Sequence, residues 1–208
     1  MKQNLALQRG FTILEFIVSF GIVAIILLAA IQLQNYIALQ QDYTLNSYLT
    51  VETADATVTT LSRELRGARN AEDGAYALQV AGDQEIVFYS DYDNDDRIEK
   101  IHYFLDGAEL KKGIIEPTDY PISYRQGNEN IFVLSSDIRN GSAPVFSYYN
   151  GDWPTDTLNN PLPVQNRLAS TRTIKIELIV NTNQIEIEND YETSSFVSIR
   201  SLKDNLWK

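Results

Sequence analysis

The chain has 208 residues, no cysteine, one histidine and a formal net charge of −11 at pH 7. This length allows one membrane segment and one soluble domain with a core of its own. The acidic balance makes nucleic acid a poor partner for the folded part, because phosphates repel it. Without cysteine there is neither a thiol nucleophile nor a disulfide, so the fold is closed by packing, hydrogen bonds or a metal.

A long apolar segment begins close to the N-terminus. From Ile13 to Leu33 the chain carries one charge, that of Glu15. At about 1.5 Å per residue, roughly 21 helical residues cross a hydrocarbon core of about 30 Å. The sequence therefore predicts a transmembrane helix. A carboxylate inside such a helix costs roughly 2.5 to 3.5 kcal/mol on insertion scales, so Glu15 needs a partner or a route to water.

The residues before this segment set its orientation. Lys2 and Arg9 precede it, and the positive-inside bias then places the N-terminus in the cytoplasm and the C-terminal domain outside. A cleaved secretory signal peptide is the alternative, with Ala29-Ala30-Ile31 as its weak cleavage site. Neither a signal peptide nor a plain signal anchor explains Glu15, although a glutamate that snorkels towards water would.

The stretch Arg9-Gly10-Phe11-Thr12-Ile13-Leu14-Glu15 resembles the start of type IV pilins and of the pseudopilins of type II secretion. The resemblance implies that residues 1–10 are a leader peptide. A prepilin peptidase would cleave between Gly10 and Phe11 and methylate the new N-terminal amine of Phe11. The resemblance also implies that Glu15 neutralises this amine on a neighbouring subunit, since opposite charges are tolerated in lipid when they pair well.

A helical pattern continues beyond the apolar segment. Apolar residues recur at intervals of three and four, and no proline interrupts them. Gly67, Asn70 and Gly74 are stop signals. We therefore expect one long helix, with residues 11–33 as its transmembrane and filament-core half and residues 34–70 as an amphipathic half. The stripe expected to face a sheet comprises Ala54, Val58, Leu61, Leu65 and Ala68.

After Gly74 the chain becomes rich in β-prone residues. Asp106-Gly107 predicts a hairpin turn, and the proline-containing stretch from Asn150 to Ser170 predicts a long surface loop. Residues 71–208 are expected to form a mainly antiparallel β-sheet domain. The whole chain is then an α+β protein whose long helix packs on that sheet, as in the pilin fold. The expected strands are 76–80, 85–90, 98–105, 109–115, 130–134, 145–149, 173–180 and 195–199.

Three further passages are similar to the larger minor subunits of this family, the PilW-like minor pilins and J-type minor pseudopilins: residues 89–105, 144–149 and 197–202. The resemblance implies a minor subunit that helps to initiate or cap a type IV pilus-like filament or a type II secretion pseudopilus. Its partners would be the prepilin peptidase, other pilin or pseudopilin subunits bound through the N-terminal helix, and the inner-membrane assembly platform. It would start as a single-pass cytoplasmic membrane protein.

Two other functions are compatible with the sequence. Within the same class, the protein would be a tip-located adhesion or binding subunit. Outside it, the protein would be a signal-anchored extracytoplasmic enzyme or sensor domain that keeps residues 1–10. The N-terminal sequence of the mature protein distinguishes the filament subunit from the anchored domain.

An acidic segment supplies the one set of residues with metal-ligand character: Asp91, Asp93, Asp95 and Glu99. Carboxylates at alternate positions of a tight loop can converge on Ca²⁺, which takes about six to eight oxygens. The first three match an EF-hand loop, but Asp96 stands at the glycine position and His102 at the final glutamate position. We therefore predict either a calcium loop of another type or a solvated turn between two strands. No other cofactor is expected.

Motifs for enzyme chemistry are absent from the sequence. His102 falls at an alternating position of an expected strand, where a structural role is commoner than that of a base. There is no Gly-x-Ser-x-Gly turn, phosphate-binding glycine loop or paired-histidine motif. We therefore predict that the protein is not an enzyme. Tyr148, Tyr149 and Trp153 would suit an adhesive surface, but such residues more often pack in a core.

Overall fold

The computed structural model describes residues 12–182 and 190–202, apart from the side chains at positions 39, 40, 42 and 43. The chain divides into two compact units, Met1–Asn46 and Ser47–Lys208. Helix α1 (Ile13–Arg66) has 54 residues, of which those up to position 46 belong to the first unit and the rest to the second.

The described part of the first unit is helical after Thr12 and apolar over most of its length. One segment, Ile13–Ala38, has the length and composition to cross a membrane, and none of it is buried inside the protein. Large side chains such as Ile13 and Ile25 are exposed, at 81% and 68%. Such a surface is compatible with anchoring by a single membrane span.

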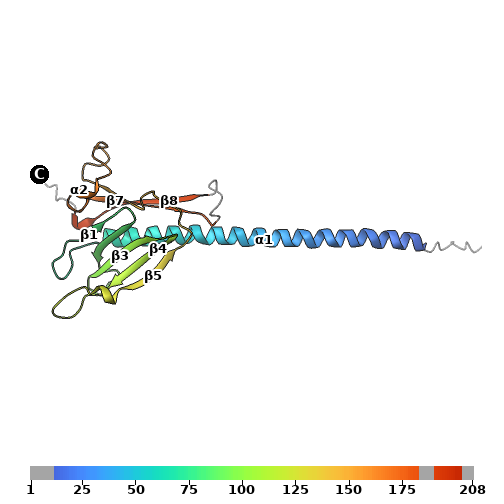
Figure 1. Cartoon of the computed structure of the whole chain (residues 1–208), viewed down its shortest axis with the longest axis horizontal. Helices are drawn as coiled ribbons and strands as arrows, with labels where there is room; N and C mark the ends of the chain where they lie inside the picture. The colour runs from blue at the N-terminus through green and yellow to red at the C-terminus, as the bar shows by residue number, and fades with distance from the viewer. Residues whose placement is uncertain (1–11, 183–189, 203–208) are drawn as a thin grey trace, which may run out of the picture. The chain divides into compact units, whose positions relative to one another are not determined.

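The second unit contains two antiparallel sheets. The first has the strand order β1-β2-β3-β4-β5, from β1 (Leu78–Ala81), β2 (Glu85–Ser90), β3 (Glu99–Asp106), β4 (Glu109–Ile115) and β5 (Asn130–Ser135). The second has the order β6-β7-β8, from β6 (Phe146–Tyr149), β7 (Thr173–Val180) and β8 (Tyr191–Ser198). Figure 1 shows the two sheets on opposite sides of the C-terminal part of α1. The α+β prediction is confirmed, and a strand forms in each of the eight expected segments.

One hydrophobic core joins the helix to both sheets. The expected stripe of α1 is at most 5% exposed at every position and continues to Ala68 just beyond the helix. It packs with inward side chains of the first sheet, such as Phe88 and Ile101, and with alternate residues of β7, such as Ile174 and Ile176. Because α1 lies between two sheets here, it buries apolar residues towards each of them.

The helix ends earlier than expected. Its last residue is Arg66, not Asn70. The N–H of Gly67 bonds to the carbonyl of Glu64 at 3.0 Å, which tightens the last turn, and the N–H of Arg69 bonds to the carbonyl of Tyr89 in β2 at 2.9 Å. By Arg69 the backbone has therefore exchanged its helical partner for a strand.

The stretch from Asn150 to Ser170 is not entirely a loop. It ends in helix α2 (Val164–Ser170), whose N-cap is Pro163 with φ −66°. Proline is well suited to the start of a helix, and no proline or glycine follows within α2. Arg167 fixes α2 in place through a 2.8 Å ion pair with Asp83 and a hydrogen bond to the carbonyl of Leu162. The short 3₁₀ turns Gln126–Asn128 and Arg200–Leu202 complete the described elements.

Candidate functional site

Thr12 and Glu15 close the first turn of α1. The backbone N–H and the hydroxyl of Thr12 both donate to Oε2 of Glu15, at 3.0 and 3.1 Å. The N–H of Glu15 in turn lies 3.3 Å from the hydroxyl oxygen of Thr12. This reciprocal pattern is a capping box, which satisfies free donors at the start of a helix. The spacing Thr-x-x-Glu before an apolar run predicts this capping box from the sequence. The family resemblance does not imply it.

The capping box gives Glu15 a partner within its own chain. It occupies Oε2, while among the described residues Oε1 accepts no hydrogen bond. One carboxylate oxygen therefore stabilises the helix start, and no described residue donates to the other. Gly10 and Phe11, the predicted cleavage residues, lie outside the described residues.

The acidic loop between β2 and β3 brings three of its four predicted ligands together. One carboxylate oxygen from each of Asp91, Asp93 and Glu99 lies within 4.8 Å of the others. The register of the two strands explains this, because Ser90 pairs with Glu99 and so places Asp91 beside it. Asp95 is not part of the trio; its Oδ1 accepts the N–H of Arg97 at 2.8 Å.

The backbone of this loop turns through the left-handed region at two places, Asn94 with φ 64° and Asp96 with φ 69°. Asp96 stands at the position where an EF-hand has glycine, so the conformation is retained although the residue is not. Aspartate and asparagine tolerate this region better than other non-glycine residues.

Glu99 is the buried member of the trio, at 2% exposure. Its Oε2 accepts the N–H of Tyr92 at 3.3 Å. Burial raises the pKa of Glu99 from an ordinary 4.5 to about 7, the Tyr92 hydrogen bond opposes the rise, and the charges of Asp93 and Asp95 add to it. A divalent cation held by the trio would favour the ionised form instead.

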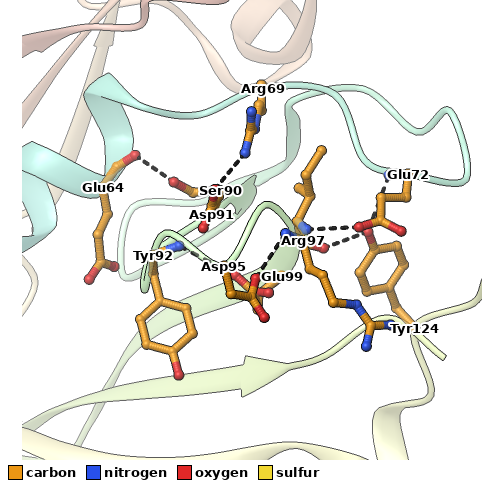
Figure 2. A network of polar contacts seen from close by, with 11 residues as sticks. Glu64, Arg69, Glu72, Ser90, Asp91, Tyr92, Asp95, Arg97, Glu99 and Tyr124 are labelled. Carbon is orange, nitrogen blue, oxygen red and sulfur yellow. Dashed lines mark hydrogen bonds and ion pairs between the residues drawn. The ribbon is translucent and has the colours of Figure 1, made fainter. Parts of the chain in front are cut away.

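Contacts on both sides of the loop hold it against the segment that follows α1 (Figure 2). Arg69 pairs with Oδ2 of Asp91 at 2.8 Å, and Oε1 of Glu72 accepts the N–H of Ile98 at 3.0 Å. The hydroxyl of Tyr124 donates to the carbonyl of Ile98 at 2.7 Å. Among the described residues, the other carboxylate oxygen of Asp91 is buried without a hydrogen-bond partner. The trio thus offers three oxygen ligands on a fixed backbone, and a calcium ion would need further oxygens from backbone or water.

A buried ion pair connects α1 to the first sheet. Nζ of Lys112 lies 2.7 Å from Oε1 of Glu64, and their side chains are 7% and 4% exposed. The hydroxyl of Tyr103 donates to the second oxygen of Glu64 at 2.8 Å. Burial and the charge of Glu64 raise the pKa of Tyr103, so it stays a donor. This pair was not predicted from the sequence, where its one signal is that Lys112 shares a strand face with the apolar residues Leu110 and Ile114.

His102 lies in a pocket of about 350 Å³ on the face of the first sheet that points away from the core. Its Nδ1 is 3.0 Å from Oε1 of Glu129, and its Nε2 is 3.7 Å from a carboxylate oxygen of Glu85. Gly113 makes this contact possible, because a Cβ there would lie 1.9 Å from Oε1 of Glu129. The described residues that line the pocket include no hydroxyl or thiol for a histidine to activate.

The aromatic residues of β6 pack rather than project. Tyr148 is fully buried and Tyr149 is 8% exposed, as the core interpretation predicted. Trp153 covers Tyr149 with their ring centroids 4.6 Å apart. Phe196 of β8 is the exposed member of this cluster, at 49%.

Comparison with known proteins adds no further assignment to these sites. Neither a scan against protein-family profiles nor a search of curated proteins gave a match for this chain. The capping box, the acidic trio, the buried pair and the His102 pocket are therefore interpreted from their own geometry.

Proposed function

We propose that this protein is a minor subunit of a type IV pilus-like filament or of a type II secretion pseudopilus. One observation carries the proposal: a membrane-length apolar helix, Ile13–Ala38, has a single charged residue, and that residue is Glu15 in its first turn. The spacing from Gly10 and Phe11 matches the cleavage motif of this family. A carboxylate in such a helix is unfavourable unless it has a partner or a route to water, and pairing during assembly would supply the partner.

Glu15 is suited to pair with an amine. The capping box fixes the carboxylate through Oε2 and leaves Oε1 for another donor. Cleavage after Gly10 would create an ammonium group at Phe11. When two such helices lie side by side, the carboxylate of one neutralises the ammonium of the other, which favours a fixed axial step in the filament.

The second unit supports a minor rather than a major subunit. Its two sheets share one core with α1 and need no disulfide. A domain of this size would occupy the end of a filament, where it helps to initiate or cap assembly. The partners in this proposal are other pilin-type helices and the assembly platform in the cytoplasmic membrane, with the second unit on the outer side.

N-terminal processing tests the proposal directly. The full chain is co-expressed with a prepilin peptidase, and the purified protein is examined by N-terminal sequencing and mass spectrometry. We expect a mature protein that begins with N-methylated Phe11, and an unprocessed chain when the peptidase is catalytically inactive. Recovery of Met1 or Lys2 in the presence of active peptidase would contradict the filament assignment and favour an anchored domain.

A further inference from the structure

A groove of about 720 Å³ lies between the C-terminal part of α1 and β8, entirely within the second unit. The helix lines it with Thr59, Ser62, Arg63 and Arg66, and the strand lines it with Thr193 and Ser195 among others. Figure 1 shows β8 beside this part of α1. We call it the α1–β8 groove.

The groove exists because the inner face of β8 is polar. Thr193 and Ser195 pair across the sheet with Leu178 and Ile176 of β7, which are fully buried in the core. Alternate residues of a strand share a face, so Thr193 and Ser195 point to the same side as buried Val197. Small hydroxyl side chains there leave the space towards α1 open, where larger apolar side chains would fill it.

β8 also presents a free sheet edge. Among the described residues it pairs with β7 alone, and the strand order ends with it. An edge strand exposes a row of backbone N–H and C=O groups that can accept another strand. Three consecutive residues of β8, Thr193, Ser194 and Ser195, line the groove, so the groove runs along this edge strand.

Ser62 supplies a second sign that the groove takes a ligand. It is 7% exposed, and its hydroxyl oxygen is buried with no hydrogen-bond partner among the described residues. A buried polar group without a partner costs about 1 to 3 kcal/mol. A polar occupant of the groove would supply the missing partner.

The charge of the groove indicates which occupant fits. The chain has a net charge of −11, yet the helix side of the groove carries two exposed arginines, Arg63 and Arg66. No salt bridge in the described part of the chain involves either of them. The one carboxylate in the lining, that of Asp55, accepts the hydroxyl of Tyr191 at 3.1 Å. The groove is therefore complementary to carboxylates.

We propose that the α1–β8 groove binds an extended acidic segment of a partner protein. The segment adds to β8 as a fourth strand of the second sheet. Its carboxylates face Arg63 and Arg66, and one of its polar groups satisfies Ser62. This recognition role is additional to filament assembly and does not depend on it, because both walls of the groove belong to the second unit.

The test uses a fluorescent seven-residue peptide of alternating acidic and apolar residues, Thr-Glu-Val-Glu-Val-Glu-Thr, and the full chain in detergent. Fluorescence anisotropy should show saturable binding with a Kd below about 1 mM. Arg63→Glu should weaken binding about tenfold or more, because it reverses a contact between opposite charges. Ser62→Ala should weaken it about fivefold, the loss of one hydrogen bond, without lowering the melting temperature of the free protein.

Matched controls separate strand addition from simple attraction. Arg125→Glu changes the net charge equally at an exposed site outside the groove lining and should leave the Kd unchanged. A peptide with N-methylated alternate amides should lose most of its affinity, because it lacks the donors for β8.

Three results would overturn the proposal. The first is no saturable binding of the acidic peptide, or equal binding of its lysine counterpart. The second is equal binding of the N-methylated peptide together with competition by inorganic phosphate, which would make the groove an anion site. The third is self-association of the protein that Arg63→Glu abolishes, which would assign the groove to a second copy of this chain.

Discussion

Glu15 caps the helix in the structure and pairs with an ammonium group in our proposal, and substitutions can separate these two roles. Capping the helix requires an acceptor oxygen for the N–H and hydroxyl of Thr12. Pairing with an ammonium group across two subunits requires a negative charge. Glutamine has the oxygen without the charge, and alanine has neither.

We therefore expect Glu15→Gln and Glu15→Ala to be cleaved normally by the prepilin peptidase but to enter filaments poorly. Incorporation is measured by immunoblotting of sheared filaments relative to the membrane fraction. The matched control is Thr12→Ala, which weakens the cap by about 1 kcal/mol and keeps the charge. If Glu15→Gln assembles as well as the unmodified chain, capping alone explains the residue and charge pairing is wrong.

Glu99 makes the stability of the second unit depend on pH in an unusual direction. Its folded pKa of about 7 lies above the ordinary 4.5, so between these values the folded state holds a proton that the unfolded state has lost. The contribution of Glu99 to the free energy of unfolding is therefore greatest below pH 4.5 and declines as pH rises to about 7.

Glu99→Gln removes this titration while keeping an acceptor for Tyr92. We expect the variant to gain about 1 to 3 kcal/mol relative to the unmodified protein at pH 8, and little or nothing near pH 4.5. Urea unfolding at a series of pH values measures the difference. A difference that does not change between pH 4.5 and 8 would show that the pKa of Glu99 is ordinary.

The calcium hypothesis for the acidic trio makes a separate prediction. At pH 8, above the pKa of about 7 of Glu99, this buried carboxylate is charged, so an ion bound by the trio stabilises the folded state by mass action. We expect calcium to raise the melting temperature relative to chelator, and Asp93→Asn to reduce this rise. Asp106→Asn, outside the trio, is the control. Equal melting temperatures in calcium and chelator would exclude the site.

At the scale of elements, the Glu64–Lys112 pair fixes α1 on the first sheet. Removing one member of a buried ion pair leaves an uncompensated charge and costs about 3 to 5 kcal/mol. We expect that loss from Lys112→Met, measured by urea unfolding. In the double variant Glu64→Gln/Lys112→Met, no charge remains buried and the hydroxyl of Tyr103 keeps an acceptor, so most of the loss should be recovered.

Lys111→Met is the matched control for this pair. Lys111 precedes Lys112 in β4 and bonds to exposed carboxylates of Asp106 and Glu109. Such surface pairs contribute about 0 to 1 kcal/mol. A similar loss from both lysine variants would mean that strand β4, rather than the buried pair, is sensitive to substitution.

Regular elements could be predicted from the sequence because their signals are local. Alternation located β7, and the threefold and fourfold spacing from Ala54 to Leu65 located the buried face of α1. Helix α2 was missed because its seven residues are too few to show a period. Helix α1 ends directly before Gly67, the first of the three stop signals, whereas the hydrogen bond from Arg69 to Tyr89 of β2, which excludes a longer helix, has no local pattern.

The candidate sites were less predictable because their residues meet only in the folded chain. Asp91, Asp93 and Glu99 were all named, but nothing local separates them from Asp95, whose oxygen turns to its own loop. Glu64 and Lys112 are 48 positions apart. Contacts of this kind depend on which strand faces the helix, and one sequence does not specify that.

At the scale of the whole molecule, the division after Asn46 predicts an independent soluble domain. Every member of the hydrophobic core lies between Ala54 and Ile199, so a fragment Ser47–Lys208 keeps the complete core. We expect the fragment to be soluble without detergent, with cooperative thermal unfolding by circular dichroism. A broad, non-cooperative transition would show that the second unit needs the apolar half of α1.

The same core has a mechanical consequence. A pull on the N-terminal end of α1 reaches the second unit through the helix segment that both sheets enclose. Because this segment packs against a sheet on each side, a force along the helix axis acts parallel to both interfaces. Many buried contacts between helix and sheets must then break at the same time. The ion pair between Glu64 and Lys112 would resist sliding of the helix along the first sheet. In the proposed filament, the second unit would then stay folded under a force applied along α1.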